Sequence, residues 1–204
     1  LVIPPWNFPF AILVGMTSAA IVTGNTVVLK PSSDSPMMGW IFTEIMKSVG
    51  LPEGVLNFCV ASGAEAGDYL VEHPKTRFIS FTGSMEVGLR INEKAAVKSE
   101  GQIWIKRVIA EMGGKDAILV DSEADVDAAA QATLISAFGF QGQKCSACSR
   151  VIVDKNVYDE FVTKLLDKVK DLKVGNPMDN VYMGPVINAK SEQNVLNYIE
   201  IGKK

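Results

Sequence analysis

The chain has 204 residues, of which 48% are hydrophobic and 21% are charged, with a formal net charge of −3. This length suits one medium-sized domain or two small ones, and the apolar fraction is large enough for a substantial core. Because the net charge is slightly negative and no basic stripe runs along the chain, the composition argues against nucleic acid as the main partner.

The three cysteines do not make an even-numbered disulfide framework, so we predict a cytoplasmic protein in a reducing compartment. The apolar run 10–29 resembles a membrane span, but polar residues interrupt it and Gly24-Asn25 indicates a turn. No lysine or arginine precedes Lys30, which argues against a signal peptide. Since the chain starts at Leu1 and stops in an expected helix, we predict a fragment of a longer protein.

Apolar, β-branched runs alternate along the chain with longer amphipathic segments. In chain order we predict a helix over 10–22, a strand over 26–29, a helix over 37–49, a strand over 55–60, a helix over 64–72, a strand over 78–81, a helix over 85–98, strands over 108–110 and 117–120, a helix over 126–138, a strand over 151–153 and a helix over 157–172. This alternation predicts an α/β fold with a parallel sheet.

Several polar residues follow predicted strands, and ligands of open parallel sheets bind at the carboxyl ends of the strands. Lys30, Ser84 and Glu111 occupy such positions, so we expect them to line one crevice. Gly83 and Ser84 make a turn at a helix N-terminus, where backbone N–H groups and the helix dipole can receive a phosphate. The Walker A and G-x-G-x-x-G motifs are both absent.

Each of these residues also has a plain structural explanation. A lysine at a strand end is often solvated, and a Gly-Ser turn between strand and helix is common α/β geometry. Glu111 could equally be a surface or N-cap carboxylate. Asn7, in the proline-bracketed segment 4–9, could be held as a hydrogen-bond donor to an oxyanion or could be an ordinary turn asparagine.

The segment 137–150, AFGFQGQKCSACSR, places Cys145 in a setting typical of a reactive thiol, after a Gly/Gln stretch and before small residues. Cys59 instead lies in an apolar run, where a buried, inert thiol is expected. His73 is the one histidine and a poorly supported partner for the thiol. Glu111 is the better general-base candidate, because the two glycines after it permit close approach.

Cys145 and Cys148 form a C-x-x-C pair that would suit a redox dithiol or half of a zinc site. A thiol–disulfide protein usually carries this pair where a strand leads into a helix, whereas here a predicted helix precedes it and a predicted strand follows. The sequence has no second pair, so we predict no metal site. A non-catalytic nucleotide-binding or interaction module is the alternative function.

Five motifs together resemble the aldehyde dehydrogenase family in order and approximate spacing. They are Pro5-Trp6-Asn7-Phe8-Pro9, Val28-Leu29-Lys30-Pro31-Ser32, Phe81-Thr82-Gly83-Ser84, Glu111-Met112-Gly113-Gly114-Lys115 and Gly142-Gln143-Lys144-Cys145. The resemblance covers essentially the whole chain and implies a parallel-sheet, Rossmann-like aldehyde dehydrogenase fold, here incomplete. It implies that residues 1–106 are the C-terminal half of an NAD(P)-binding domain and residues 107–204 the N-terminal part of a catalytic domain.

The resemblance implies roles for single residues. Cys145 matches the nucleophile that attacks the aldehyde, Asn7 the side-chain donor of the oxyanion hole, and Glu111 the base that activates water. Positions on the cofactor side are matched by Trp6, Lys30, Ser33, Gly83 and Ser84.

The cofactor implied by the resemblance is NAD. Lys30 would contact its adenosine ribose, and Ser84 would face its pyrophosphate. Many members that prefer NAD have a glutamate where this chain has Ser33. Without that carboxylate a 2′-phosphate meets less repulsion, so we also predict tolerance of NADP.

The segments 102–121 and 137–150 most resemble members that oxidise L-glutamate γ-semialdehyde to L-glutamate, the last step of proline degradation. The implied partner is a small-molecule aldehyde, with neither nucleic acid nor membrane involved, and the implied parent enzyme is a homo-oligomer. Because chains of this family are more than twice as long, we expect the isolated chain to be inactive.

Overall fold

The computed structural model describes residues 1–203, and the chain divides into two compact units, Leu1–Met112 and Gly113–Lys204. The boundary predicted between residues 106 and 107 precedes strand β5 (Arg107–Glu111), which pairs with β4 (Phe78–Thr82) and therefore belongs to the first unit. The assignment of the two parts to cofactor binding and catalysis stays a prediction.

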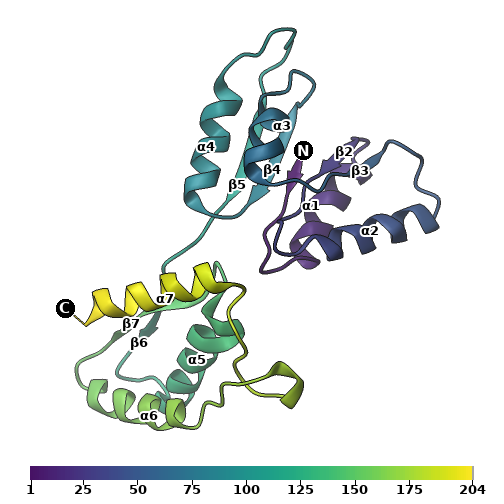
Figure 1. The fold of residues 1–204 in the computed structure, drawn as a ribbon. Coiled ribbons are helices and arrows are strands. Elements are labelled where there is room, and N and C mark those ends of the chain that lie inside the picture. Colours follow the sequence, from purple (N-terminus) through teal and green to yellow (C-terminus); the bar gives the residue numbers. More distant parts are fainter. Residues whose placement is uncertain (204) are drawn as a thin grey trace. The chain divides into compact units, whose positions relative to one another are not determined.

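The first unit is built on a five-stranded sheet in which every neighbouring pair is parallel (Figure 1). Its strands run in the order β3-β2-β1-β4-β5. The strands not yet defined are β1 (Val2–Ile3), β2 (Val27–Leu29) and β3 (Leu56–Phe58). The order reverses direction between β1 and β4, which makes this a doubly wound sheet. The predicted α/β class and parallel pairing are confirmed.

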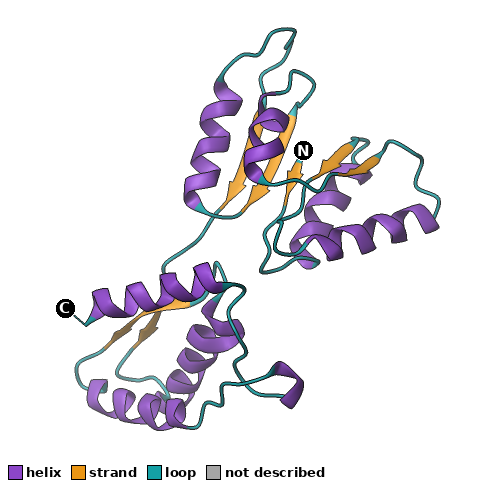
Figure 2. Cartoon of the chain, in the orientation of Figure 1, coloured by secondary structure: helices purple, strands orange, loops and turns teal. Residues whose placement is uncertain are grey.

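Four α-helices connect these strands (Figure 2). They are α1 (Ala11–Val22), α2 (Pro36–Ser48), α3 (Asp68–Glu72) and α4 (Met85–Ala96). Right-handed crossovers place α1 and α2 on one face of the sheet and α3 and α4 on the other. The buried apolar residues form two separate clusters accordingly, one of Val2, Leu13, Val27, Leu29 and Phe42, and one of Val71, Ile79, Phe81, Ile91 and Ala95.

The predicted helix 64–72 is in fact two elements. A π-helical turn, Gly63–Gly67, precedes α3 and has a capping box at its N-terminus. In this box Ser62 Oγ accepts from the Glu65 amide, and the Glu65 carboxylate accepts from the Ser62 amide. These hydrogen bonds lower the pKa of Glu65. Apolar periodicity does not distinguish a π-helical turn from an α-helix, so the sequence pattern merged them.

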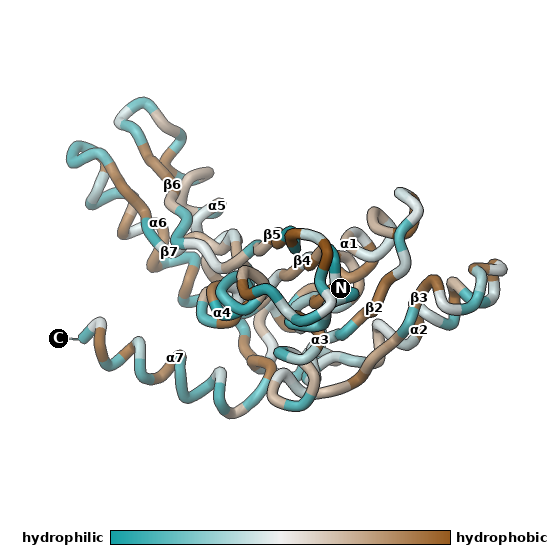
Figure 3. The backbone as a smooth tube through the Cα atoms, turned by 90° about the horizontal axis from the view of Figure 1, so that it is seen from above, coloured by the Kyte–Doolittle hydropathy of each residue, from teal (hydrophilic) through white to brown (hydrophobic). Residues whose placement is uncertain are grey.

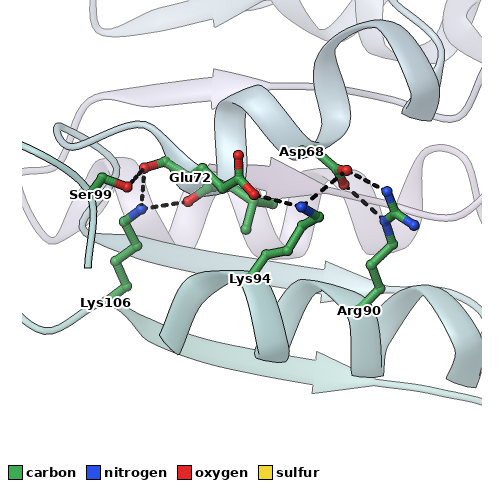
Figure 4. A network of polar contacts seen from close by, with 7 residues as sticks. Asp68, Glu72, Arg90, Lys94, Ser99 and Lys106 are labelled. Atoms are coloured by element: carbon green, nitrogen blue, oxygen red, sulfur yellow. Dashed lines mark hydrogen bonds and ion pairs between the residues drawn. The ribbon is translucent and has the colours of Figure 1, made fainter. Parts of the chain in front are cut away.

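A polar network joins α3, α4 and the loop before β5 (Figure 4); its labelled members are Asp68, Glu72, Arg90, Lys94, Ser99 and Lys106. The buried Lys106 Nζ donates to the carbonyls of Val71 (2.8 Å) and Glu72 (2.6 Å) at the end of α3. Burial lowers the pKa of Lys106, whereas the hydrogen bond from Arg90 lowers the pKa of Asp68. The network thereby fixes the chain that enters β5, whose last residue is Glu111.

The second unit has two parallel strands, β6 (Asp116–Val120) and β7 (Cys148–Val153), joined through α5 (Val126–Phe138). The helices α6 (Tyr158–Lys170) and α7 (Ala189–Gly202) follow β7, and 3-10 turns span Gly139–Gly142 and Pro177–Asp179. The core of this unit contains Val120, Val126, Ala130 and Phe161.

Helix α7 has no buried residue, and Figure 3 shows it apart from β6 and β7 of the same unit. Leu119 of β6 and Ile152 of β7 are exposed as well, with 75% and 59% of their surface accessible. A two-stranded sheet thus leaves apolar side chains at the surface of this unit. Among residues 1–203, no helix is both long and apolar enough to cross a membrane.

Candidate active and nucleotide-binding site

The carboxyl ends of the strands of a parallel sheet lie at one edge, and four candidate residues of the first unit lie at this edge. Lys30 directly follows β2, Ser84 closely follows β4, Glu111 ends β5, and Asn7 lies a few residues after β1. The Gly83 amide donates to the Glu111 carbonyl (3.0 Å), which links the last two strands at the same edge.

The sheet reverses its winding between β1 and β4, and ligands of doubly wound sheets bind at such a switch point. Trp6 and Asn7, both half-buried, follow β1 on one side of it, and Gly83 and Ser84 follow β4 on the other. Topology alone therefore predicts that a ligand binds at this place, without any reference to motifs.

Lys30 is only 6% exposed, so the alternative of an ordinary solvated lysine is wrong. Burial lowers its pKa, and the negative charge of Cys59 in its thiolate form partly offsets that effect. Among residues 1–203 its ammonium has no hydrogen-bond or ion-pair partner. The aliphatic stem of this side chain is buried, whereas its ammonium is not among the fully buried polar atoms without a partner. Its N–H donors are therefore available to oxygen atoms of a ligand, and the side chain fits a ribose.

Gly83 and Ser84 each have a structural role that does not depend on a ligand. A Cβ on Gly83 would lie 2.6 Å from Cζ of Phe81, so the ring of Phe81 requires glycine at this position whatever ligand binds. Ser84 is the N-cap of α4, and its Oγ accepts from the Val87 amide (3.3 Å). The N-terminus of α4 still presents its dipole to this edge, which fits a phosphate group. Ser33 lies exposed in the loop before α2.

We expect Lys30→Met to weaken NAD binding about tenfold or more, because it removes one charge-assisted hydrogen bond from the ammonium to the ribose. The same change is expected to raise stability by about 1 kcal/mol, since partial burial disfavours the charged form of this side chain. NAD titration followed by protein fluorescence and urea unfolding measure the two effects.

The difference in unfolding free energy between the wild type and Lys30→Met should depend on pH. Folding lowers the pKa of Lys30 below the ordinary lysine pKa of about 10.4. Between these two pKa values the unfolded chain binds more protons than the folded chain does. The wild type should therefore gain stability as the pH rises through that window, and Lys30→Met should lack this gain. Lys47→Met, at an exposed lysine paired with Glu44, is the control and should change neither binding nor the pH dependence.

In the second unit, Cys145 is exposed and lies in a tight turn in which the Lys144 carbonyl accepts from the Ala147 amide (3.3 Å). Its backbone is closely packed, because a Cβ on Gly114 would lie 2.8 Å from the Cys145 carbonyl oxygen. The expected close approach at the two glycines is thus realised at Gly114, within this unit. An exposed thiol on a closely packed backbone is a suitable nucleophile.

The turn before Cys145 is strained. Phe140 (φ 58°), Gln141 (φ 57°) and Gly142 (φ 67°) are consecutive left-handed residues, and the first two carry side chains. Each such non-glycine residue costs on the order of 1–2 kcal/mol, so surrounding contacts must stabilise the turn. The sequence pattern does not predict this turn; its one signal is the recurrence of glycine and glutamine in residues 139–143.

The remaining sulfur and imidazole groups have local contacts. His73 Nδ1 accepts from the Lys75 amide (3.2 Å), and its ring packs edge-on against Tyr69. Cys148 Sγ donates to the Arg150 carbonyl (3.2 Å). Cys59 is half-buried, whereas a buried thiol was expected. In the part of the chain that the structure describes, no three His, Cys, Asp or Glu side chains gather as metal ligands.

A cavity of about 710 Å³ lies between the C-terminal half of α4 and residues 102–106. Those residues lead into β5, so the cavity lies at the amino end of that strand, away from the carboxyl edge that carries the candidate residues. Trp104, Lys98 and Ile103 are among its lining residues. We do not assign it to the nucleotide.

The carboxyl edge of the sheet in the first unit and the exposed thiol turn in the second unit are the two candidate features on the chain. The family model of the aldehyde dehydrogenase family matches residues 1–204. The chain therefore belongs to the aldehyde dehydrogenase family.

Within this family the chain is similar to 1-pyrroline-5-carboxylate dehydrogenases. It is 59% identical over 205 aligned residues to the one from Geobacillus sp. (strain WCH70), covering 100% of this chain and 40% of the relative. It is 58% identical to the one from Staphylococcus aureus (strain JH1), covering 99% of this chain and 39% of the relative. The chain thus spans about two fifths of the length of these curated relatives.

Solved structures agree with this relationship. The 1-pyrroline-5-carboxylate dehydrogenase from Thermus with bound NAD matches with a TM-score of 0.97 and 50% identity, covering 99% of this chain and 39% of that one. A proline utilization A from Bdellovibrio bacteriovorus matches with a TM-score of 0.95 and 47% identity, covering 99% and 21%. The expected fold, that of an incomplete aldehyde dehydrogenase, is confirmed.

Proposed function

We propose that this chain is the central part of an NAD(P)-dependent enzyme that oxidises L-glutamate γ-semialdehyde to L-glutamate in proline degradation. The observation that carries the proposal is the exposed Cys145 thiol on a closely packed turn, in a chain 59% identical to a 1-pyrroline-5-carboxylate dehydrogenase. The expected domain roles, cofactor binding for residues 1–106 and catalysis for residues 107–204, are part of the proposal.

The first bond forms between sulfur and carbon. The Cys145 thiolate attacks the aldehyde carbon, and the electron pair of the carbonyl moves to its oxygen. The Asn7 amide donates a hydrogen bond to that oxyanion, which stabilises the thiohemiacetal. A bound nicotinamide would supply the hydride acceptor at this point. Loss of hydride from the carbon attached to Cys145 would convert the adduct into a thioester.

Water then releases the product. The Glu111 carboxylate takes a proton from water as the oxygen adds to the thioester carbon. The carbon–sulfur bond breaks, the thiolate of Cys145 is restored and the carboxylic acid leaves as glutamate. The sum is aldehyde, water and NAD⁺ giving carboxylate, NADH and two protons.

On the cofactor side, we propose that Lys30 binds the adenosine ribose and that Gly83 and Ser84 receive the pyrophosphate at the start of α4. The first assignment is supported by the buried Lys30 side chain, whose ammonium has no hydrogen-bond or ion-pair partner among residues 1–203. Trp6 and Ser33 complete this side, and the absence of a carboxylate at Ser33 favours tolerance of NADP.

The test is NADH formation from L-glutamate γ-semialdehyde, measured on this chain and on the enzyme at the full length of its relatives. We expect activity from the full-length enzyme alone. Activity of the 204-residue chain would contradict the proposal that catalysis needs the rest of the enzyme. Nucleotide binding by the full-length enzyme without NADH formation would favour a non-catalytic nucleotide-binding module instead.

A further inference from the structure

Two glutamine side chains connect the left-handed turn before Cys145 to a distant part of the second unit. Gln143 Oε1 accepts from the Ile187 amide (3.0 Å), across more than forty positions of sequence. Gln141, oriented so that both ends of its amide are satisfied, accepts from the Gly184 amide (2.7 Å) and donates to the Phe140 carbonyl (3.2 Å). The segment Gly184–Ile187 is therefore bound to the turn at both of its ends.

Gln143 also closes the turn from within. Its backbone amide donates to the Phe140 carbonyl (3.1 Å), and its side-chain Nε2 approaches the same oxygen (3.5 Å). Gln143 thus contacts both Phe140, the first left-handed residue of the turn, and Ile187. Because the left-handed conformation of Phe140 and Gln141 is unfavourable by itself, such contacts decide whether it persists.

The partner segment is itself closely packed, which allows it to serve as an anchor. A Cβ on Gly184 would lie 2.8 Å from Cγ of Pro177. On the other side of the turn, a Cβ on Gly142 would lie 3.0 Å from the Ala137 carbonyl at the end of α5. The turn is held between α5 and the segment Gly184–Ile187 with little room to shift.

We propose that Gln143 is a positioning residue for the Cys145 nucleophile, a role that rests on the proposed function of that thiol. Gln143 stands two positions before Cys145, so the hydrogen bond to Ile187 fixes the strained turn and with it the backbone from which the thiol projects. It does not itself touch the substrate. A misplaced nucleophile lowers the rate of attack without changing how the cofactor binds.

The test uses Gln143→Leu in the enzyme at the full length of its relatives. We expect kcat for aldehyde oxidation to fall about tenfold or more, and KM for NAD to stay within about twofold. Hydrogen exchange at the Ile187 amide should become about tenfold faster, since its acceptor is lost. Gln143→Glu should restore kcat to within about threefold of wild type, because a carboxylate oxygen still accepts from Ile187.

Gln131→Leu is the matched control, at an exposed position of α5, and should leave kcat and the Ile187 exchange unchanged. If Gln143→Leu does not fold, Gln143→Asn repeats the test, because it keeps the amide but is too short to reach Ile187. A folded variant with wild-type kcat, or a Gln143→Glu variant as slow as Gln143→Leu, would overturn the positioning role alone. A wild-type enzyme that forms no NADH would instead overturn the proposed function.

Discussion

In the enzyme at the full length of its relatives, Cys145→Ala is expected to lower NADH formation from the aldehyde by on the order of 10⁴-fold or more, because the variant has no atom that can form the thiohemiacetal. The fold should be retained, since the Cys145 side chain is exposed and the close contact with Gly114 is made by the backbone carbonyl. NADH absorbance measures the rate, and NAD titration followed by protein fluorescence should give an unchanged dissociation constant.

Cys148→Ala is the matched control for this experiment. Cys148 is three positions away and half-buried, and its thiol donates to the Arg150 carbonyl within its own strand. We expect this variant to keep most of its activity. If Cys148→Ala were as inactive as Cys145→Ala, both thiols would be required, and a single-nucleophile mechanism would have to be abandoned in favour of dithiol chemistry.

The sequence predicted the main architecture because the apolar periodicities are strong. The helix 126–138 is observed with those bounds, and the strands around 78–81 and 117–120 differ by only one residue at an end. The weak point is β1, which has two residues and so gives no periodic signal. It nevertheless lies at the centre of the sheet, between β2 and β4, and its position creates the switch point.

The candidate site was predicted by residue type but not by environment. That Lys30 stands after a strand is evident from the sequence, whereas the burial of its side chain depends on long-range packing, which periodicity does not encode. Gly83 was predicted as part of a turn that can receive a phosphate, but the contact that requires glycine there is the ring of Phe81.

The strained turn before Cys145 shows a different limit. Its left-handed residues include Phe140 and Gln141, types that rarely adopt this conformation, so no propensity rule predicts it. Its stabilising contacts come from Gly184 and Ile187, far along the chain. A feature that local sequence disfavours and long-range contacts maintain is expected to occur near a functional residue.

Glu111→Gln should separate the two halves of the reaction. Hydride transfer precedes the step that needs a base, so the variant should form about one NADH per active site and then turn over about 10²- to 10⁴-fold more slowly than wild type. The accumulated thioester on Cys145 should react with hydroxylamine to give a hydroxamate. Glu123→Gln, at an exposed carboxylate without an ion pair among the described residues, should behave as wild type. Because Gln retains the shape of Glu, a slow steady state without the burst would place the role of Glu111 before hydride transfer and refute its assignment as the hydrolytic base.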